Sequence, residues 1–481
     1  MSDSMPRLPA GGRPRERVLD AMRARRSDDV KWQAGRVWSL VFYPGDQIAG
    51  LVKDAYALFF SENGLNPTAF PSLRGFETDV VAMTAGLLGG DAEVAGNMTS
   101  GGTESILLTV LTAREWGRAR RPAVREPEMI LPLTAHPAFD KAAHYFGVRP
   151  VRVPVRKDFR ADVAAVEAAI TKNTVLLVGS APSYPHGVVD PIADLARVAR
   201  RRGLLLHVDA CVGGMMLPFV RRLGYPAPEF DFGVPGVTSI SVDLHKYGYA
   251  AKGASVILYR SRELHRHQLF AQTDWPGGIY ASPTMTGTRP GGAIAAAWAV
   301  MQHLGESGYL AIADEVMRTT VRLKQGIGEI AGVRVLSDPD MSVFAIGSDT
   351  LDIYEVGDEL TLRGWHLDRQ QFPPCLHMTV NAAHAKVADA FLRDLAAAVA
   401  AARRPSLRRT RVALTVGLAR AAARVLPAPL MRLLTTRAGG PGARLPSRTA
   451  AMYGMMGSLP NRGDIREVVL DLVESFTRPQ G

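Results

Sequence analysis

The chain has 481 residues, of which 47% are hydrophobic and 21% are charged, with 46 glycines and 32 prolines. This composition is typical of a globular protein with a full core and excludes a disordered or fibrous chain. Two cysteines, Cys211 and Cys375, are too few for a disulfide framework or a cysteine-only zinc site. They predict a reducing compartment, the cytoplasm, and we expect no metal site.

Residues 1–29 are rich in Arg, Pro and Gly and lack the apolar run of a signal peptide or membrane anchor. The longest apolar run elsewhere, 293–301, is far shorter than the ~20 residues of a membrane-spanning helix. We therefore expect a soluble protein, or one that rests on a membrane surface.

The middle of the chain alternates β-branched runs with helical stretches. Strands are predicted at 129–133, 151–155, 174–179, 204–209, 237–242 and 255–260. A helix is predicted at 191–202, with Asp190 as a candidate cap, Pro191 at the first helical position and Gly203 after the end. Apolar strands alternating with helices favour an α/β fold, in which a mostly parallel sheet is covered on both faces and ligands bind beyond the carboxyl ends of its strands.

From about residue 306 the pattern becomes that of a smaller α+β domain. Its predicted elements are a long helix at 309–330, a strand near 333–345, a helix near 353–363, a strand at 376–380, a helix through 400 and a last helix at 465–476. We predict an N-terminal segment (1–60), a large cofactor-binding domain (61–305), a small C-terminal domain (306–400 and 449–481) and an Arg-rich insertion (401–448).

The net charge of +11 is located in this late part of the chain, because twelve arginines but no lysine or acidic residue lie between Asp394 and Asp464. The remainder is close to neutral. The stretches 412–418 and 425–434 look amphipathic, so one interpretation is peripheral contact of 401–448 with anionic lipid. Another is a solvated insertion whose arginines face water. Nucleic-acid binding is disfavoured because no recognition motif or aromatic interleaving accompanies the arginines.

Two motifs follow predicted strands and supply candidate catalytic groups. Lys246 lies in VDLHKYGY (242–249), where a desolvated lysine with a lowered pKa suits a Schiff base with a carbonyl cofactor. A surface lysine past a strand end is the plain alternative. Asp209 ends the strand 204–209, where a carboxylate can pair with a pyridine nitrogen or, more simply, cap a helix.

Two further motifs suit the other parts of a cofactor. Gly102 and Thr103, in SGGTES (100–105), open an apolar helix (106–116), whose N-terminus can bind a phosphate or mark a plain turn. His136 follows a strand and can stack on a cofactor ring or serve a structural role. Together, in this order over about 145 residues, the four motifs specify a pyridoxal-phosphate site.

With these motifs, the sequence resembles the group II pyridoxal-phosphate decarboxylase family and, within it, the sphingosine-1-phosphate lyases, including bacterial ones. The resemblance covers roughly 38–302 and returns at 450–457. Its most specific stretches are TSGGTESIL (99–107), DLHKYGYAAKG (243–253), SPT (282–284) and GTRPGG (287–292). It implies the type I, aspartate aminotransferase-like fold and an obligate homodimer with shared active sites.

The resemblance also implies roles for individual residues. For the cofactor these are Lys246 as the covalent attachment, Asp209 at the pyridine nitrogen, His136 on the ring, Gly102, Thr103 and His245 at the phosphate, and Gly287 and Thr288 from the second subunit. For catalysis and the substrate phosphate they are Lys246, His245, Tyr43, Tyr184, Lys252 and Asn66. At Asn66 the lyases have a histidine, and an asparagine donates a hydrogen bond but carries no charge.

The implied reaction is retro-aldol cleavage of a phosphorylated sphingoid base, an amphipathic lipid phosphate, to a long-chain aldehyde and phosphoethanolamine. A phosphate anchor at Lys252 and Tyr43 favours breakage of the C2–C3 bond. A pocket for a substrate carboxylate favours amino-acid decarboxylation on the same scaffold, which is the main alternative. A cofactor-free binding protein is a further interpretation, and it requires Lys246 to be idle.

Overall fold

The computed structural model describes residues 8–404 and 462–477, and the predicted stretches 412–418, 425–434 and 450–457 lie outside them. Its centre is a seven-stranded sheet in the order β1-β7-β6-β5-β4-β2-β3. The strands are β1 (Ala95–Thr99), β2 (Glu128–Pro132), β3 (Arg149–Val153), β4 (Thr174–Ser180), β5 (Leu205–Asp209), β6 (Ser239–Val242) and β7 (Ser255–Tyr259). All are parallel except β7, which is antiparallel to both neighbours, so the predicted fold class is confirmed.

Alternation along the strands sends apolar side chains to both faces of this sheet. On one face, Leu176 and Val178 pack with residues of α4 (Gly102–Arg120) and α5 (Ala138–Phe146). On the other, Leu177 packs with a larger core that includes α7 (Ile192–Arg202) and α8 (Leu217–Arg222). Burial on both faces is why these strands read as continuous apolar runs.

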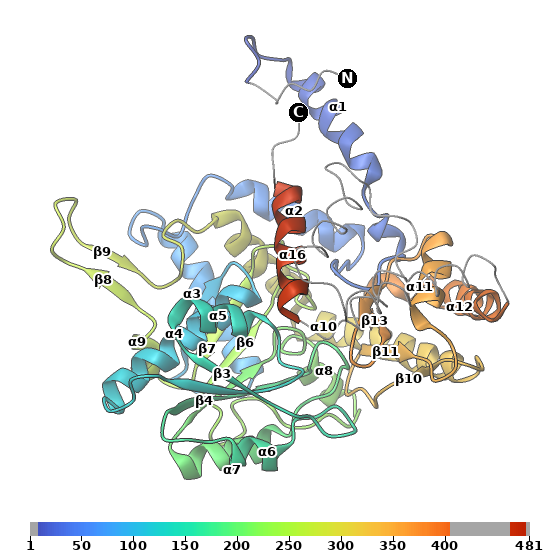
Figure 1. The fold of residues 1–481 in the computed structure, drawn as a ribbon. Coiled ribbons are helices and arrows are strands. Elements are labelled where there is room, and N and C mark those ends of the chain that lie inside the picture. Colours follow the sequence, from blue (N-terminus) through green and yellow to red (C-terminus); the bar gives the residue numbers. More distant parts are fainter. Residues whose placement is uncertain (1–7, 405–461, 478–481) are drawn as a thin grey trace.

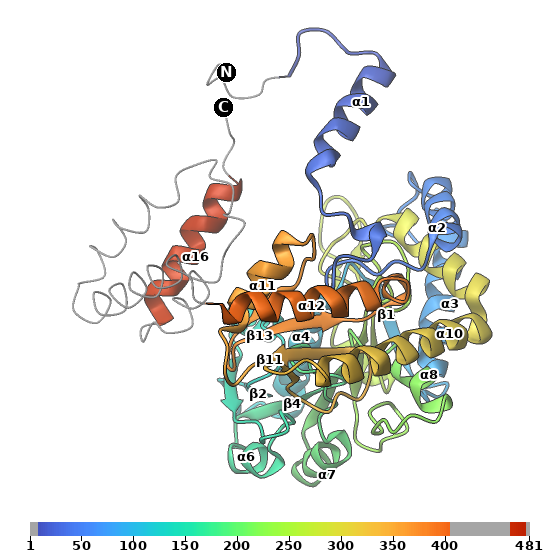
Figure 2. The same cartoon turned by 90° about the vertical axis from the view of Figure 1, so that its right-hand side faces the viewer.

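A second, antiparallel sheet follows in the chain, in the order β10-β11-β13-β12. Its strands are β10 (Arg334–Val335), β11 (Val343–Gly347), β12 (Asp368–Gln370) and β13 (Cys375–Thr379). The helices α11 (Ile353–Leu362) and α12 (Ala388–Arg403) lie beside it, as Figure 2 shows. Within the N-terminal segment, Trp38 is fully buried against this unit, where it stacks on His384 and contacts Phe391.

The remaining described elements surround these two sheets. They are α1 (Arg15–Arg25), η1 (Arg26–Asp28), η2 (Trp32–Ala34), α2 (Asp46–Leu58), α3 (Pro71–Leu87), α6 (Val163–Ala168), α9 (Arg262–Arg266), β8 (Phe270–Gln272), β9 (Tyr280–Ser282), α10 (Gly291–Gly328), η3 (Ala382–His384) and α16 (Arg462–Thr477). Helix α1 and the β8–β9 hairpin project from the body (Figure 1). None of the helices in the described ranges is long and apolar enough to cross a membrane.

The structure differs from the predicted elements in a few places. Asp190 does not cap α7, because its carboxylate accepts the backbone N–H groups of Ala161 and Ser180, at 2.7 and 2.8 Å. The strand predicted at 333–345 is two strands, β10 and β11. The long helix predicted at 309–330 is part of α10, which starts at Gly291 and kinks at Gly305, beside the predicted domain boundary.

Candidate active site

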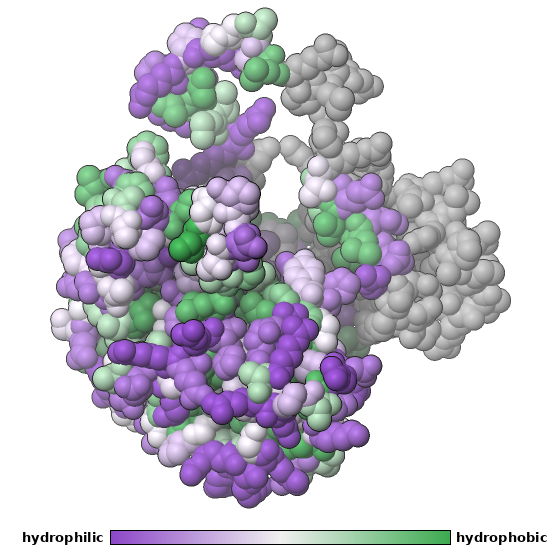
Figure 3. All heavy atoms as spheres, turned by 90° about the vertical axis from the view of Figure 1, so that its left-hand side faces the viewer, coloured by the Kyte–Doolittle hydropathy of each residue, from purple (hydrophilic) through white to green (hydrophobic). Residues whose placement is uncertain are grey.

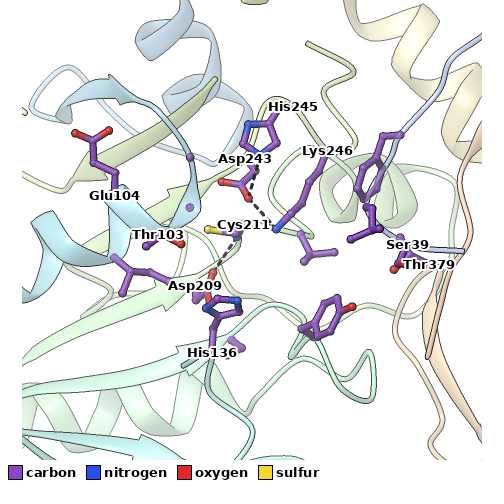
Figure 4. Close-up of a pocket in the computed structure, with 18 of the residues that line it drawn as sticks. Ser39, Thr103, Glu104, His136, Asp209, Cys211, Asp243, His245, Lys246 and Thr379 are labelled. Carbon is purple, nitrogen blue, oxygen red and sulfur yellow. Dashed lines mark hydrogen bonds and ion pairs between the residues drawn. The ribbon is translucent and has the colours of Figure 1, made fainter. Parts of the chain in front are cut away.

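The carboxyl ends of β4, β5 and β6 meet the N-terminus of α4 at one edge of the large sheet, where they surround a cavity of about 470 Å³. Most of the predicted site residues line it: Gly102, Thr103, His136, Tyr184, Asp209, His245, Lys246 and Lys252. Figure 4 labels five of them, Thr103, His136, Asp209, His245 and Lys246. These residues are far apart in sequence. They converge because parallel strands deliver their carboxyl ends to the same side of a sheet.

The N-terminus of α4 forms one wall of the cavity. No side chain in the described part of the chain caps this helix, so its first backbone N–H groups are available to an anion, and the helix dipole adds positive potential. Glycine is required at position 102, since a Cβ there would lie 2.7 Å from the Cys211 sulfur. Glu104 holds the preceding turn by accepting the Ser100 N–H and hydroxyl, both at 2.7 Å.

Lys246 reaches into the cavity from the turn after β6. Its amine lies 2.7 Å from the carboxylate of Asp243, which is 3% exposed, and Figure 4 shows the two directed toward each other. Burial lowers the pKa of Lys246, but the effects of Asp243, followed by those of Cys211 and Asp209, together outweigh it, and the pKa lies above its usual value. The expectation of a lowered pKa is therefore wrong for the protein without its cofactor, because the expectation did not include Asp243.

Asp209 is the last residue of β5, and His136 follows β2, which is separated from β5 by β4. Oδ1 of Asp209 accepts the backbone N–H of Cys211 at 3.1 Å. Its Oδ2 makes no hydrogen bond to any residue in the described ranges, and the residue lines the cavity. Nδ1 of His136 accepts the backbone N–H of Ala138 at 3.1 Å, which fixes the ring at the cavity wall.

Lys252 places a second ammonium group at the mouth of the cavity. Its Nζ donates to the carbonyl oxygens of Leu40 and His245, at 3.1 and 3.2 Å, and it makes no ion pair among residues 8–404. Desolvation by the surrounding protein, together with the charge of Lys246, lowers the pKa of Lys252 to about 8. The cavity thus holds a cation that has no carboxylate partner among the described residues.

Tyr184 connects the cavity with the small sheet. Its hydroxyl donates to Oδ2 of Asp368, on β12, at 3.0 Å, and its ring stacks on His377, on β13, with centroids 4.0 Å apart. Burial raises the pKa of the Tyr184 phenol strongly, and the Asp368 charge raises it further. Tyr184 is therefore a neutral phenol whose own proton is directed at Asp368.

Four predicted residues lie away from the lining of this cavity. Tyr43 donates to Asp46 and packs edge-on against Trp32. The amide oxygen of Asn66 accepts from Thr68 and Ala69 in an exposed turn. Gly287 and Thr288 lie in the segment between β9 and α10. Their predicted roles remain predictions.

Asp243, Cys211 and the wall residues Ser39 and Thr379 were not predicted as site residues, although all four line the cavity. For Asp243 a signal existed, because an acid three residues before a lysine can reach it within one turn. Ser39 and Thr379 carry no such signal. They reach the cavity through the packing of the N-terminal segment and β13.

These residues fit pyridoxal phosphate. The α4 N-terminus and the backbone at Gly102 offer a cradle for the phosphate, and the Asp209 carboxylate has one oxygen available to a pyridine nitrogen. The Lys246 amine lines the same cavity. The site thus offers separate partners for the phosphate, ring nitrogen and aldehyde of that cofactor.

Comparison with known proteins agrees with this geometry. The pyridoxal-dependent decarboxylase conserved domain matches residues 29–345. The chain is 42% identical to sphingosine-1-phosphate lyase of Oryza sativa subsp. japonica over 466 residues, 95% of this chain and 79% of the plant protein. It is 43% identical to sphingosine-1-phosphate lyase 1 of Rattus norvegicus, over 82% of this chain and 69% of the rat protein.

The structure of a sphingosine-1-phosphate lyase from Burkholderia pseudomallei superposes with a TM-score of 0.80 at 42% identity, covering 86% of this chain and 96% of that one. Domain match, sequence identity and fold agree, and pyridoxal phosphate is the cofactor that they imply. The chain belongs to the pyridoxal-dependent decarboxylase family of enzymes, in the part of it that includes the sphingosine-1-phosphate lyases.

Proposed function

We propose that the protein cleaves the C2–C3 bond of a phosphorylated sphingoid base, such as sphingosine 1-phosphate, and releases a long-chain aldehyde and phosphoethanolamine. The observation that carries this proposal is Lys252, a cation at the cavity mouth with no carboxylate partner in the described chain. A substrate phosphate supplies the missing anion. The similarity to sphingosine-1-phosphate lyases supports the same substrate class.

When bound, pyridoxal phosphate supplies an electron sink for the bond that is broken. The α4 N-terminus with Gly102 and Thr103 would hold its phosphate, Asp209 would bind its ring nitrogen, and His136 would support its ring. The amine of Lys246 acts as the attachment point. In the free protein the Asp243 carboxylate, 2.7 Å away, stabilises the protonated form of this amine, and the proton must leave before the amine can act as a nucleophile.

The protonation states of Lys252 and Tyr184 indicate different roles toward the substrate. Lys252 remains largely cationic near pH 7, because its pKa is about 8, and binds the phosphate. Tyr184 Oη can accept the proton of the substrate's C3 hydroxyl while its own phenol proton moves to Asp368 Oδ2, 3.0 Å away. Tyrosinate, which burial and Asp368 both disfavour, does not then accumulate.

Product analysis tests the reaction. Purified holoenzyme is incubated with a phosphorylated sphingoid base and, in parallel, with a mixture of amino acids, and the products are identified by mass spectrometry. Long-chain aldehyde together with phosphoethanolamine is the expected result. Amines and carbon dioxide without aldehyde would instead assign the chain to amino-acid decarboxylation. Lys246→Ala serves as the control and is expected to abolish turnover.

We also propose a homodimer in which Gly287 and Thr288 act at the partner's site. Neither residue lines its own cavity. The adjacent β8–β9 hairpin exposes Phe270, Trp275 and Ile279, the last at 79%, although a two-stranded hairpin is marginally stable without a covering surface. Figure 3, which looks at the hairpin side, shows hydrophobic side chains gathered across the middle of the surface.

Sedimentation together with subunit mixing tests the dimer. Lys246→Ala and Thr288→Tyr are each expected to be inactive alone, because one lacks the attachment lysine and the other blocks the partner's site. Mixed dimers carry one site free of both changes, so activity is expected to return on mixing. A monomer by sedimentation, or a mixture that remains inactive, would contradict shared sites.

For the cellular location we propose the cytoplasm, with peripheral membrane contact through the Arg-rich segment 401–448. The eleven arginines of this segment, which contains no acidic residue, support attraction to anionic lipid. Sedimentation with vesicles that contain or lack phosphatidylserine tests this contact, and equal binding to both would contradict an electrostatic role.

A further inference from the structure

A row of polar residues is buried behind Asp209, on the side of the sheet that α4 covers. His207 precedes Asp209 by two residues on β5, and the sheet register pairs these two residues with Ser239 and Ser241 on β6. Because side chains alternate along a strand, all four point to the same face. His207 and Ser241 are 0% exposed, so water does not share their hydrogen bonds.

These residues form one continuous chain of contacts. His207 Nδ1 lies 2.9 Å from Ser239 Oγ, and its Nε2 lies 3.2 Å from Ser241 Oγ. Ser241 Oγ in turn donates to Asp209 Oδ1 at 3.4 Å. The chain therefore runs from Ser239 through the imidazole to the carboxylate that faces the cofactor site.

The direction of the protons in this chain follows from counting donors. Ser241 has one hydroxyl proton, which it uses in the hydrogen bond to Asp209. Its contact with His207 Nε2 is then a hydrogen bond only if Ser241 Oγ is the acceptor. Nε2 therefore carries the ring proton. Nδ1 then accepts the proton of Ser239. Thr109, the other hydroxyl near Nδ1, uses its proton on the Ser105 carbonyl at 2.9 Å.

The opposite tautomer breaks this arrangement. With the ring proton on Nδ1, Ser241 donates to His207, and Asp209 loses its hydroxyl donor. The negative charge of Asp209 favours the first arrangement, since hydrogen bonds to a charged acceptor are the stronger ones. Burial keeps the imidazole neutral by lowering the pKa of His207 to about 4, against the opposing effect of the Asp209 charge.

We propose that His207 is a positioning residue for the cofactor. By donating a hydrogen bond to Ser241, it makes the Ser241 hydroxyl donate to Oδ1 of Asp209, and Oδ2 is left to bind the pyridine nitrogen. Oδ1 then accepts two hydrogen bonds, from Ser241 and from the Cys211 N–H, which fix the rotation of the carboxylate. This inference rests on the cofactor site and is independent of which substrate bond the enzyme breaks.

Cofactor binding to the apoenzyme tests the proposal without any substrate. The dissociation constant of pyridoxal phosphate is measured by titration for the wild type, Ser241→Ala, His207→Phe and the double variant. Each single variant is expected to weaken binding about tenfold, as for the loss of one buried hydrogen bond to a charged group. The double variant is expected to be no weaker than the singles, because both changes interrupt one chain.

Two further variants distinguish a positioning role of His207 from a purely structural role. His207→Gln retains a donor toward Ser241 and is expected to recover most of the affinity. Thr112→Val is the matched control, because it removes a buried hydroxyl that contacts Tyr259 at 2.9 Å, outside the chain, and is expected to bind the cofactor normally. The pH midpoint of the bound cofactor's visible absorbance is expected to shift in His207→Phe and to stay in place in Thr112→Val.

Several results would overturn the proposal. One is wild-type affinity in His207→Phe, and another is affinity losses that add in the double variant. If His207→Phe does not fold, as judged by circular dichroism, Ser239→Ala replaces it, since it removes the donor to Nδ1 and is expected to weaken cofactor binding. Unchanged affinity in Ser239→Ala would then refute a role for the imidazole.

Discussion

Replacing Asp243 by asparagine is expected to lower the pKa of Lys246 and so to make its amine more reactive. At 2.7 Å and an effective dielectric constant of about 20, the two charges attract each other by about 6 kcal/mol, or roughly four pKa units. Once that attraction is removed, the effect of burial remains and lowers the pKa of Lys246. We expect a fall of at least about two units after relaxation of the site.

Competitive acylation of the apoprotein at pH 8, followed by peptide mass spectrometry, measures this change. The acylation rate of Lys246 is expected to rise at least about tenfold in Asp243→Asn relative to exposed Lys157, because the neutral fraction of the amine rises. Ser255→Ala is the control, since it removes the 2.7 Å hydroxyl contact with Asp243 but keeps the charge. Equal Lys246 reactivity in wild type and Asp243→Asn would refute the argument that Asp243 controls this proton.

Lys252→Ala is expected to leave the cofactor bound but to raise KM for phosphorylated substrates selectively. The wild-type KM for these substrates is expected to rise above about pH 8, where Lys252 loses its charge. Equal effects on unphosphorylated analogues would argue against phosphate binding by Lys252. Asp368→Asn is expected to lower kcat about 100-fold with little change in KM, because Tyr184 loses its proton acceptor, and steady-state kinetics with an unchanged kcat would exclude the relay. Phe391→Ala is expected to cost about 3–5 kcal/mol in the free energy of unfolding, measured in urea, because it empties a buried site against Trp38; a loss below about 1 kcal/mol would show that this contact is not part of the core.

Sequence predicted the large sheet well because most of its strands are buried on both faces. The apolar runs at β2, β4 and β5 leave little ambiguity, and Gly203 marks the end of α7 in a left-handed conformation. Strand β1 was missed since AGNMT contains glycine and asparagine, which are poor strand formers, and its conformation comes from antiparallel pairing with β7. Propensity is a property of one segment, whereas this pairing joins residues about 160 positions apart.

For the site, the order of motifs predicted which side chains meet, because strand ends of a parallel sheet share an edge. The hydrogen bonds that orient those side chains depend on the register between neighbouring strands, which a single sequence does not specify. Asp209 lies beside Ser241 because β5 and β6 pair in one particular alignment, and a shift by one residue would turn Ser241 to the other face. Tyr184 likewise meets Asp368 through the packing of two separate sheets.

The position of Asp368 in the chain has a consequence for how this enzyme can diversify. It lies beyond residue 345, the end of the match to the shared family domain, as does Thr379 on the cavity wall. The groups for the cofactor, from Gly102 to Lys246, all lie inside that match. Grafting the β11–β13 region of a relative onto this chain is thus a route to new substrates in which the groups that hold the cofactor are inherited unchanged.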